Sequence, residues 1–154
     1  MGYVTHSQQD TMEFAGALAD MLSAGDTVLL EGDLGTGKSV MARGIARALG
    51  VKAAMPSPTF TLMIPYEGKE KIYHFDLYRL ADPDEFYEAG LDEFVGGDGI
   101  ALVEWPRMAE LEAEPALYVE IARGSDDDER VFTIRNCGVR GYDAEALARW
   151  RQCE

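Results

Sequence analysis

The feature that most constrains the fold is a glycine-rich segment between a run of β-formers and a helical pattern. Residues 27–31 read Thr-Val-Leu-Leu-Glu, which is typical of a short buried strand. Residues 32–39 read Gly-Asp-Leu-Gly-Thr-Gly-Lys-Ser and match G-x-x-x-x-G-K-[ST] at every fixed position. Apolar residues then recur at helical spacing until a stop at Gly50. A strand, a glycine-rich turn and a helix in this order predict a phosphate-binding loop, or P-loop.

Each fixed position of this loop has a physical task. The glycines at 32, 35 and 37 allow positive φ angles and a close approach of the backbone to phosphate. The amide N–H groups and the positive end of the following helix attract that anion. We expect Lys38 to reach the β- and γ-phosphate oxygens and the Ser39 hydroxyl to bind Mg²⁺. A glycine-rich helix cap would explain the glycines but not the Lys-Ser pair.

A P-loop also needs an acid on the metal side, at the end of a neighbouring strand. Glu104 ends the apolar run at 100–103, and Asp76 follows the β-forming run at 71–75. Either carboxylate could bind the metal or its water shell, and either could orient an attacking water. The residues alone leave the choice between these two acids open.

The rest of the pattern predicts strands and helices around this unit. Residues 59–66 and 71–75 are expected to form one hairpin, and residues 116–122 and 130–136 another. A first helix is expected to begin at a capping arrangement, Asp10-Thr11-Met12-Glu13, and to end at Gly25. Further elements are a helix opened by Asp82-Pro83, a buried strand at 100–104 and a last helix from Asp143 to Trp150.

These elements predict an α/β fold with helices on both faces of the sheet. We expect a P-loop NTPase three-layer sandwich. Its mixed sheet would have a parallel nucleotide-binding part and an antiparallel hairpin part. A chain of 154 residues has the length of one domain.

Charge excludes some classes of partner. The chain has 14 Lys+Arg against 28 Asp+Glu, a formal net charge of −14. Autonomous binding of nucleic acid or of an anionic membrane requires a basic surface, so neither is expected. Seven of the acids and no base lie within residues 81–98, which form either a solvated face or a docking face for a basic partner. No long apolar run and no secretory signal is evident, which predicts a cytoplasmic protein.

Three further motifs accompany the P-loop: Ser57-Pro58-Thr59-Phe60, His74-Phe75-Asp76-Leu77-Tyr78-Arg79 and Leu102-Val103-Glu104-Trp105. In order and spacing, this set closely resembles the bacterial TsaE (YjeE) family over residues 10–121. The resemblance implies a single P-loop ATPase domain over residues 1–154, in which residues 122–154 complete the fold. It implies ATP and Mg²⁺ as cofactors and a TsaD–TsaB complex as partner. Together these proteins would form N6-threonylcarbamoyladenosine at position 37 of tRNAs that read ANN codons, with tRNA held only through the partners.

The resemblance also implies roles for individual residues. Catalytic roles fall to Lys38, Glu104 and Asp76, of which Asp76 would orient water or metal, and the metal would lie on Ser39 and Glu104. Thr11 would lie near the base or ribose, unless it only caps a helix, and Trp105 would either stack near the nucleotide or pack in the core. Thr59 would belong to a switch-like segment, and His74, Tyr78 and Arg79 would shape the site or the partner surface. The nucleotide would be bound by Thr11, Gly35, Thr36, Gly37, Lys38, Ser39 and Val40.

Two features depart from the family pattern. Ser39 stands where the family commonly has Thr, a change that keeps the hydroxyl, and the last third of the chain after Ala122 carries no recognisable motif. Two alternatives remain open at this stage. One is a small-molecule kinase on the same loop, although 154 residues leave little room for an acceptor subdomain and an arginine-bearing lid. The other is a nucleotide-gated binding module that does not hydrolyse ATP.

Overall fold

The structure is a computed structural model that describes residues 2–56, 58 and 61–152. Its strands are β1 (Gly2–Thr5), β2 (Thr27–Glu31), β3 (Met63–Glu67), β4 (Lys71–Asp76), β5 (Ile100–Glu104), β6 (Ala116–Arg123) and β7 (Arg130–Cys137). Its α-helices are α1 (Gln8–Ala19), α2 (Lys38–Ala48) and α3 (Pro83–Glu88). Its 3₁₀ helices are η1 (Leu91–Phe94), η2 (Pro106–Ala109) and η3 (Ala144–Trp150).

In the described part of the chain, the strands form one seven-stranded sheet in the order β1-β7-β6-β2-β5-β4-β3. The central strands β6, β2, β5 and β4 run parallel. The strands on either side pair antiparallel, β7 with both β6 and β1, and β3 with β4. The predicted mixed sheet, with a parallel part and two hairpins, is therefore confirmed. Because the central strands are parallel, their carboxyl ends meet at one edge of the sheet.

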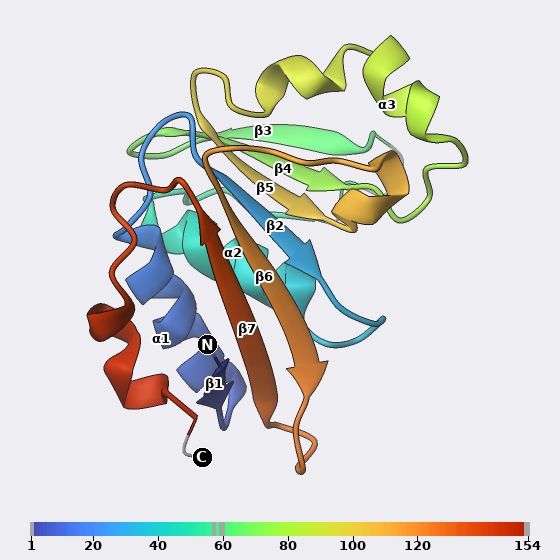
Figure 1. Cartoon of the computed structure of the whole chain (residues 1–154). Coiled ribbons are helices and arrows are strands. Elements are labelled where there is room, and N and C mark those ends of the chain that lie inside the picture. The colour runs from blue at the N-terminus through green and yellow to red at the C-terminus, as the bar shows by residue number, and fades with distance from the viewer. Residues whose placement is uncertain (1, 57, 59–60, 153–154) are drawn as a thin grey trace.

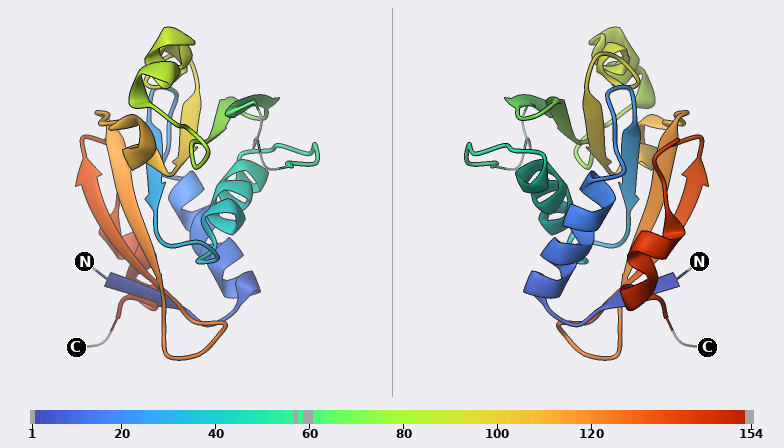
Figure 2. Two further views of the ribbon diagram at one scale, coloured as in Figure 1. Left: turned by 90° about the vertical axis from the view of Figure 1, so that its right-hand side faces the viewer. Right: turned by 90° about the vertical axis from the view of Figure 1, so that its left-hand side faces the viewer.

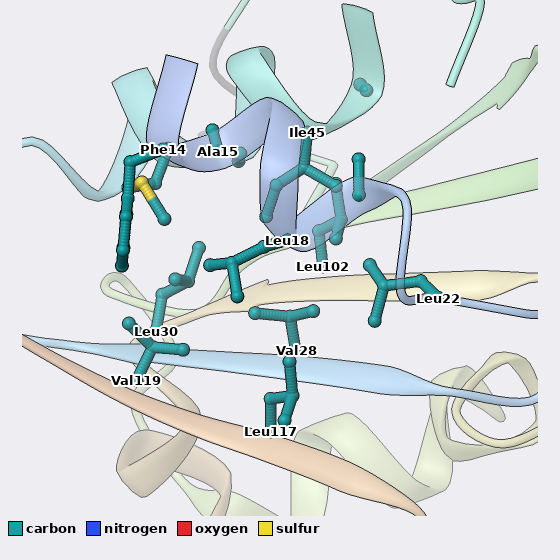
Figure 3. Close-up of a cluster of buried hydrophobic side chains, with 14 of the residues drawn as sticks. Phe14, Ala15, Leu18, Leu22, Val28, Leu30, Ile45, Leu102, Leu117 and Val119 are labelled. Atoms are coloured by element: carbon teal, nitrogen blue, oxygen red, sulfur yellow. The ribbon is translucent and has the colours of Figure 1, made fainter. Parts of the chain in front are cut away.

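Helices cover both faces of this sheet (Figures 1 and 2). On one face, α1, α2 and η3 bury the larger of two hydrophobic cores. On the other face, α3, η1 and η2 pack over β4 and β5, with Phe86 against Phe75. Figure 3 shows the larger core, where helix side chains meet apolar residues of β2, β5 and β6: Phe14, Ala15, Leu18, Leu22, Ile45, Val28, Leu30, Leu102, Leu117 and Val119.

The first helix begins earlier than the sequence predicts. Ser7 is the N-cap of α1, and its hydroxyl accepts the Asp10 N–H at 3.0 Å. The predicted cap at Asp10 is wrong, because this carboxylate binds elsewhere: it accepts the His6 N–H and the Trp150 indole N–H. The α-helix also ends at Ala19, short of the predicted stop at Gly25, and the chain continues through tight turns.

Other boundaries differ from the prediction as well. β3 begins at Met63, whereas the predicted strand began at Thr59, which lies outside the described residues. The last helix is capped by Asp143 as predicted, but it is a 3₁₀ helix. β1 was not predicted. It forms because Gly2–Thr5 adds to the edge of the sheet beside β7, a long-range pairing with little local signal.

The acidic segment at 81–98 is partly explained by local structure. Asp82 and Glu85 form a capping box at the start of α3, which is the helix start that the Asp82-Pro83 signal predicted. Asp98 accepts hydrogen bonds from the Tyr73 hydroxyl at 2.6 Å and the Lys71 ammonium at 3.2 Å. These three acids have structural tasks, so any docking role would fall to the remaining ones.

Among the described residues, none of the helices combines the length and the apolar character that crossing a bilayer requires.

Candidate functional site

The P-loop lies where the sequence predicts it, between the end of β2 and the start of α2. Gly32 has a φ of 154°, and a Cβ there would collide with the Ile121 carbonyl oxygen and lie 2.8 Å from the Thr36 hydroxyl. Gly37 is the N-cap of α2 and takes the left-handed conformation, with a φ of 105°. Both positions therefore require glycine for a physical reason, namely close approach at one and a positive φ at the other.

Lys38 is folded back on its own loop. Its Nζ donates to the carbonyl oxygens of Gly32 at 2.7 Å and Asp33 at 2.8 Å, and lies 4.2 Å from the centre of the Trp105 ring. Only 5% of the residue is exposed. Burial lowers the pKa of Lys38 below its ordinary value, because it disfavours the charged ammonium. Nearby carboxylates oppose this effect: Glu104, Glu31, Asp76 and Asp33.

Ser39 and Glu104 are brought together by tertiary structure. The Ser39 hydroxyl donates to Glu104 Oε1 at 2.9 Å, although 65 positions separate the two residues. This contact arises because β2 and β5 are parallel neighbours, so that Glu104 ends beside the P-loop. Asp76 pairs with Glu104 in the β4–β5 register. Both predicted acids therefore lie at the same edge of the sheet.

A pocket of about 360 Å³ opens at this edge. All three predicted catalytic residues line it, as do Ser39, Gly35, Gly37 and Val40 of the predicted nucleotide-binding set. Lys38 is the lone cation lining this pocket within the described part of the chain, and it faces two carboxylates. Such a pocket is locally anionic until a cation is added. The predicted catalytic and metal-binding residues thus lie together, and their roles remain predictions.

The donor set fits Mg²⁺. Ser39 and Glu104 supply hard oxygen atoms at 2.9 Å from one another, which is the ligand type that Mg²⁺ takes. Among the described residues, no group of three or more His, Cys, Asp or Glu side chains could hold a metal by itself. Mg²⁺ usually completes its shell with water and substrate phosphate, so these two residues suit a metal that arrives with a nucleotide.

Thr11 lies beside the opposite side of the loop. It lines a smaller pocket of about 130 Å³ together with Thr36, Gly37 and Val40. Its hydroxyl is 2.6 Å from that of Thr5, and the residue is 5% exposed. The helix-cap interpretation of Thr11 is wrong, since Ser7 caps α1. Its proposed place near the base or ribose remains a prediction.

Two arginines that the sequence reasoning missed contact the P-loop. Arg130 Nε donates to the Thr36 carbonyl oxygen at 2.8 Å, and Arg123 donates to the Gly35 carbonyl oxygen at 3.2 Å. Both come from the β6–β7 hairpin, in the part of the chain without a recognisable motif. Arg130 also lines the Thr11 pocket. No local sequence signal marks these residues, because the contacts span about 90 positions and depend on the fold of the sheet.

The other motif residues lie around the phosphate pocket. Trp105 is buried, and Tyr78 packs on it with ring centres 4.8 Å apart. Both line the pocket, and the stacking of Trp105 near a nucleotide remains a prediction. Arg79 is exposed on the surface. The predicted switch residue Thr59, like Ser57 and Phe60, lies outside the described residues.

A larger cavity of about 890 Å³ lies on the outer side of the same loop. Its walls include Arg107 and Arg123 but none of Lys38, Ser39 and Glu104. The chemistry expected of a P-loop is therefore concentrated in the smaller pocket.

Comparisons with known proteins agree with this geometry. The family described as "Threonylcarbamoyl adenosine biosynthesis protein TsaE" matches residues 5–132. The tRNA threonylcarbamoyladenosine biosynthesis protein TsaE of Bacillus subtilis is 36% identical over 137 residues, 88% of this chain and 85% of that protein. The protein of the same name from Treponema pallidum is 39% identical over 134 residues, which cover 87% and 99% of the two chains.

A solved structure leads to the same group of proteins. The crystal structure of Bacillus subtilis YdiB aligns with a TM-score of 0.75 and 33% identity, covering 97% of this chain and 91% of YdiB. The family match spans residues 5–132, a range that contains the P-loop, Asp76 and Glu104, and the aligned relatives extend over most of the chain. The chain therefore belongs to the TsaE family, whose members are named for tRNA threonylcarbamoyladenosine biosynthesis, and it has a P-loop NTPase fold.

Proposed function

We propose that this protein is a Mg²⁺- and ATP-binding, slowly hydrolysing ATPase. In this proposal it acts with TsaB and TsaD to form N6-threonylcarbamoyladenosine at position 37 of tRNAs that read ANN codons. The observation that carries the proposal is the meeting of Lys38, Ser39 and Glu104 around one pocket at the carboxyl edge of the sheet, with Asp76 beside them. We further propose that residues 1–154 constitute one ATPase domain and that the protein works in the cytoplasm, together with the partner proteins that hold tRNA.

The chain's own residues have distinct tasks in this proposal. The backbone amides from Gly35 to Ser39 bind the β-phosphate, and Lys38 turns from the carbonyls of Gly32 and Asp33 to the β- and γ-phosphates. Ser39 and Glu104 hold Mg²⁺, which neutralises charge that develops on the phosphate oxygens. Asp76, which lines the same pocket, accepts a hydrogen bond from an attacking water and orients it.

The charges around the pocket support slow hydrolysis by the chain alone. P-loop enzymes that hydrolyse quickly place an arginine on the transferred phosphate. Among the described residues that line the phosphate pocket there is no arginine, and Lys38 already serves the phosphates. We therefore expect hydrolysis to rise when the TsaD–TsaB complex is present.

The net charge of −14 favours an assembly in which proteins other than this chain bind the tRNA. A surface with twice as many acids as bases repels the phosphate backbone of tRNA. We propose that tRNA is held by the partner proteins, and we expect negligible binding of tRNA to the isolated chain at physiological salt. A gel shift of tRNA with the purified chain would contradict this expectation.

Reconstitution tests the proposal. The chain, TsaB, TsaD, tRNA, an activated threonylcarbamoyl donor and Mg-ATP are combined, and phosphate release and tRNA modification are both measured. We expect modification to continue over many turnovers only when the chain is present, and phosphate release to rise above that of the chain alone. Lys38→Ala should behave as if the chain were omitted. If modification proceeds while phosphate release attributable to the chain stays at background, the ATPase role is wrong and a nucleotide-gated binding module replaces it.

A further inference from the structure

Glu104 makes a second buried contact that the metal role does not require. Its Oε2 lies 2.6 Å from Nε2 of His74, while its Oε1 accepts the Ser39 hydroxyl at 2.9 Å. His74 is 1% exposed and Glu104 3% exposed. One carboxylate oxygen of Glu104 thus contacts Ser39 at the start of α2, and the other contacts His74 of β4.

The strand register explains why His74 reaches this acid. His74 pairs with Leu102 in the parallel β4–β5 ladder, so Glu104 lies two positions further along β5. Asp76 also lies two positions after His74, and side chains two apart project to the same face of a strand. His74, Asp76 and Glu104 therefore form one polar group at the end of two neighbouring strands.

The hydrogen between the two groups has a defined place. With Glu104 ionised, its carboxylate only accepts, and Nε2 of His74 is then assigned the hydrogen that it shares with Oε2. Nδ1 of His74 is buried and has no hydrogen-bond partner among the described residues. No competing contact therefore pulls the ring away from Glu104. His74 supplies a hydrogen-bond donor to the buried carboxylate of Glu104. A buried carboxylate without such a donor would cost free energy.

We propose that His74 is a positioning residue that fixes the rotation of Glu104, so that Oε1 faces Ser39 and the metal side of the pocket. This inference rests on the proposed function, because the carboxylate is held ready for Mg²⁺ bound with ATP. Partners of this kind, one step removed from a metal, typically change metal affinity by about 10- to 100-fold. His74 thereby sets how strongly Mg²⁺ increases the affinity for ATP.

A pair of amide substitutions separates this role from simple packing. Gln places its amide nitrogen as many bonds from Cβ as Nε2 of histidine, whereas Asn is one bond shorter. His74→Gln can keep the donor to Glu104, and His74→Asn cannot. Calorimetry measures the ATP dissociation constant of each variant in Mg²⁺ and in EDTA, and thermal unfolding without nucleotide records stability.

For His74→Asn we expect the Mg²⁺-dependent gain in ATP affinity to fall about 10-fold or more, while the affinity in EDTA changes less than about threefold. His74→Gln should keep most of the gain. The same substitution is also made in a Glu104→Gln background. There, His74→Asn should not change the Mg²⁺-dependent gain in ATP affinity any further. This double variant also serves as the test if His74→Asn alone folds poorly.

Two results overturn the inference with the proposed function intact. One is a Mg²⁺-dependent gain in ATP affinity in His74→Asn that equals the gain in the wild-type protein. The other is an equal loss in both amide variants that follows their loss of thermal stability. A wild-type chain that binds no ATP in Mg²⁺ refutes the proposed function itself, and this inference falls with it.

Discussion

Replacement of Lys38 by Ala gives the sharpest test of the P-loop. The side chain carries the cation that lines the phosphate pocket, and it donates two hydrogen bonds to the carbonyls of Gly32 and Asp33. When nucleotide binds, we expect Lys38 to exchange these two hydrogen bonds for hydrogen bonds to phosphate oxygens. The substitution therefore removes interactions from both the free and the bound state.

The size of the effect follows from this exchange. A hydrogen bond to a charged group contributes about 1.5–3 kcal/mol. Two hydrogen bonds to phosphate, in which both partners are charged, would contribute about twice that amount. The two hydrogen bonds to neutral carbonyls that break on binding have only Lys38 charged, and we take them to offset about half of it. The net effect of the substitution is then about 1.5–3 kcal/mol, or about a 10- to 150-fold rise in the dissociation constant of Mg-ATP.

The same substitution should change the stability of the free protein very little. The Asp33 carbonyl loses the Lys38 donor but keeps the Thr36 N–H and hydroxyl, at 3.3 Å and 2.9 Å. The Gly32 carbonyl loses the Lys38 donor without such a replacement. The substitution also removes the free-energy cost of burying the Lys38 ammonium, and this change stabilises the folded protein. We expect the free energy of unfolding to change by less than about 1.5 kcal/mol.

Calorimetry with Mg-ATP measures the affinity, and chemical denaturation measures the stability. Lys52→Ala is the matched control, because it removes the same charge from an exposed position. A Lys38→Ala affinity within about threefold of wild type, with the control also unchanged, would refute the assignment of Lys38 to the phosphates.

Three further outcomes concern the acids and the arginines. Glu104→Ala should weaken Mg²⁺-dependent hydrolysis by about 100-fold, the equivalent of one missing interaction with a charged group; if Asp76→Ala does so and Glu104→Ala does not, the metal-side acid is Asp76. Arg130→Gln should weaken nucleotide binding about 10-fold, because the Thr36 carbonyl is left without the Arg130 donor. Arg135→Gln, on the exposed face of the same strand, should not weaken nucleotide binding. Equal losses of nucleotide affinity in the two variants would refute the role of Arg130. Hydrogen bonds from Tyr73 and Lys71 hold the pKa of Asp98 below its ordinary 3.8, so ionised Asp98 stabilises the fold above that pH, and this contribution disappears as the pH falls through the lower folded-state pKa. Asp98→Asn should therefore flatten the acid side of a plot of unfolding free energy against pH, and an unchanged acid side would contradict the assignment.

The sequence alone determined the local unit that carries the phosphate chemistry. β2, the P-loop and α2 each have a short-range signal: β-formers for the strand, glycines for the turn and helical periodicity for the helix. The second hairpin and the start of α3 were predicted for the same reason. Where the prediction failed, at Ser7 and at β1, several cap candidates lay close together or the pairing strand lay far along the chain.

The tertiary structure decided which residues surround that unit. The motifs suggested Glu104 and Asp76, but only the parallel order of β2, β5 and β4 brings them to one edge beside Ser39. The contact of His74 with Glu104 and that of Arg130 with the P-loop join segments 30 and 94 positions apart. Contacts of this kind depend on sheet order and register, which arise from burial of the two cores as a whole and from no single stretch of sequence.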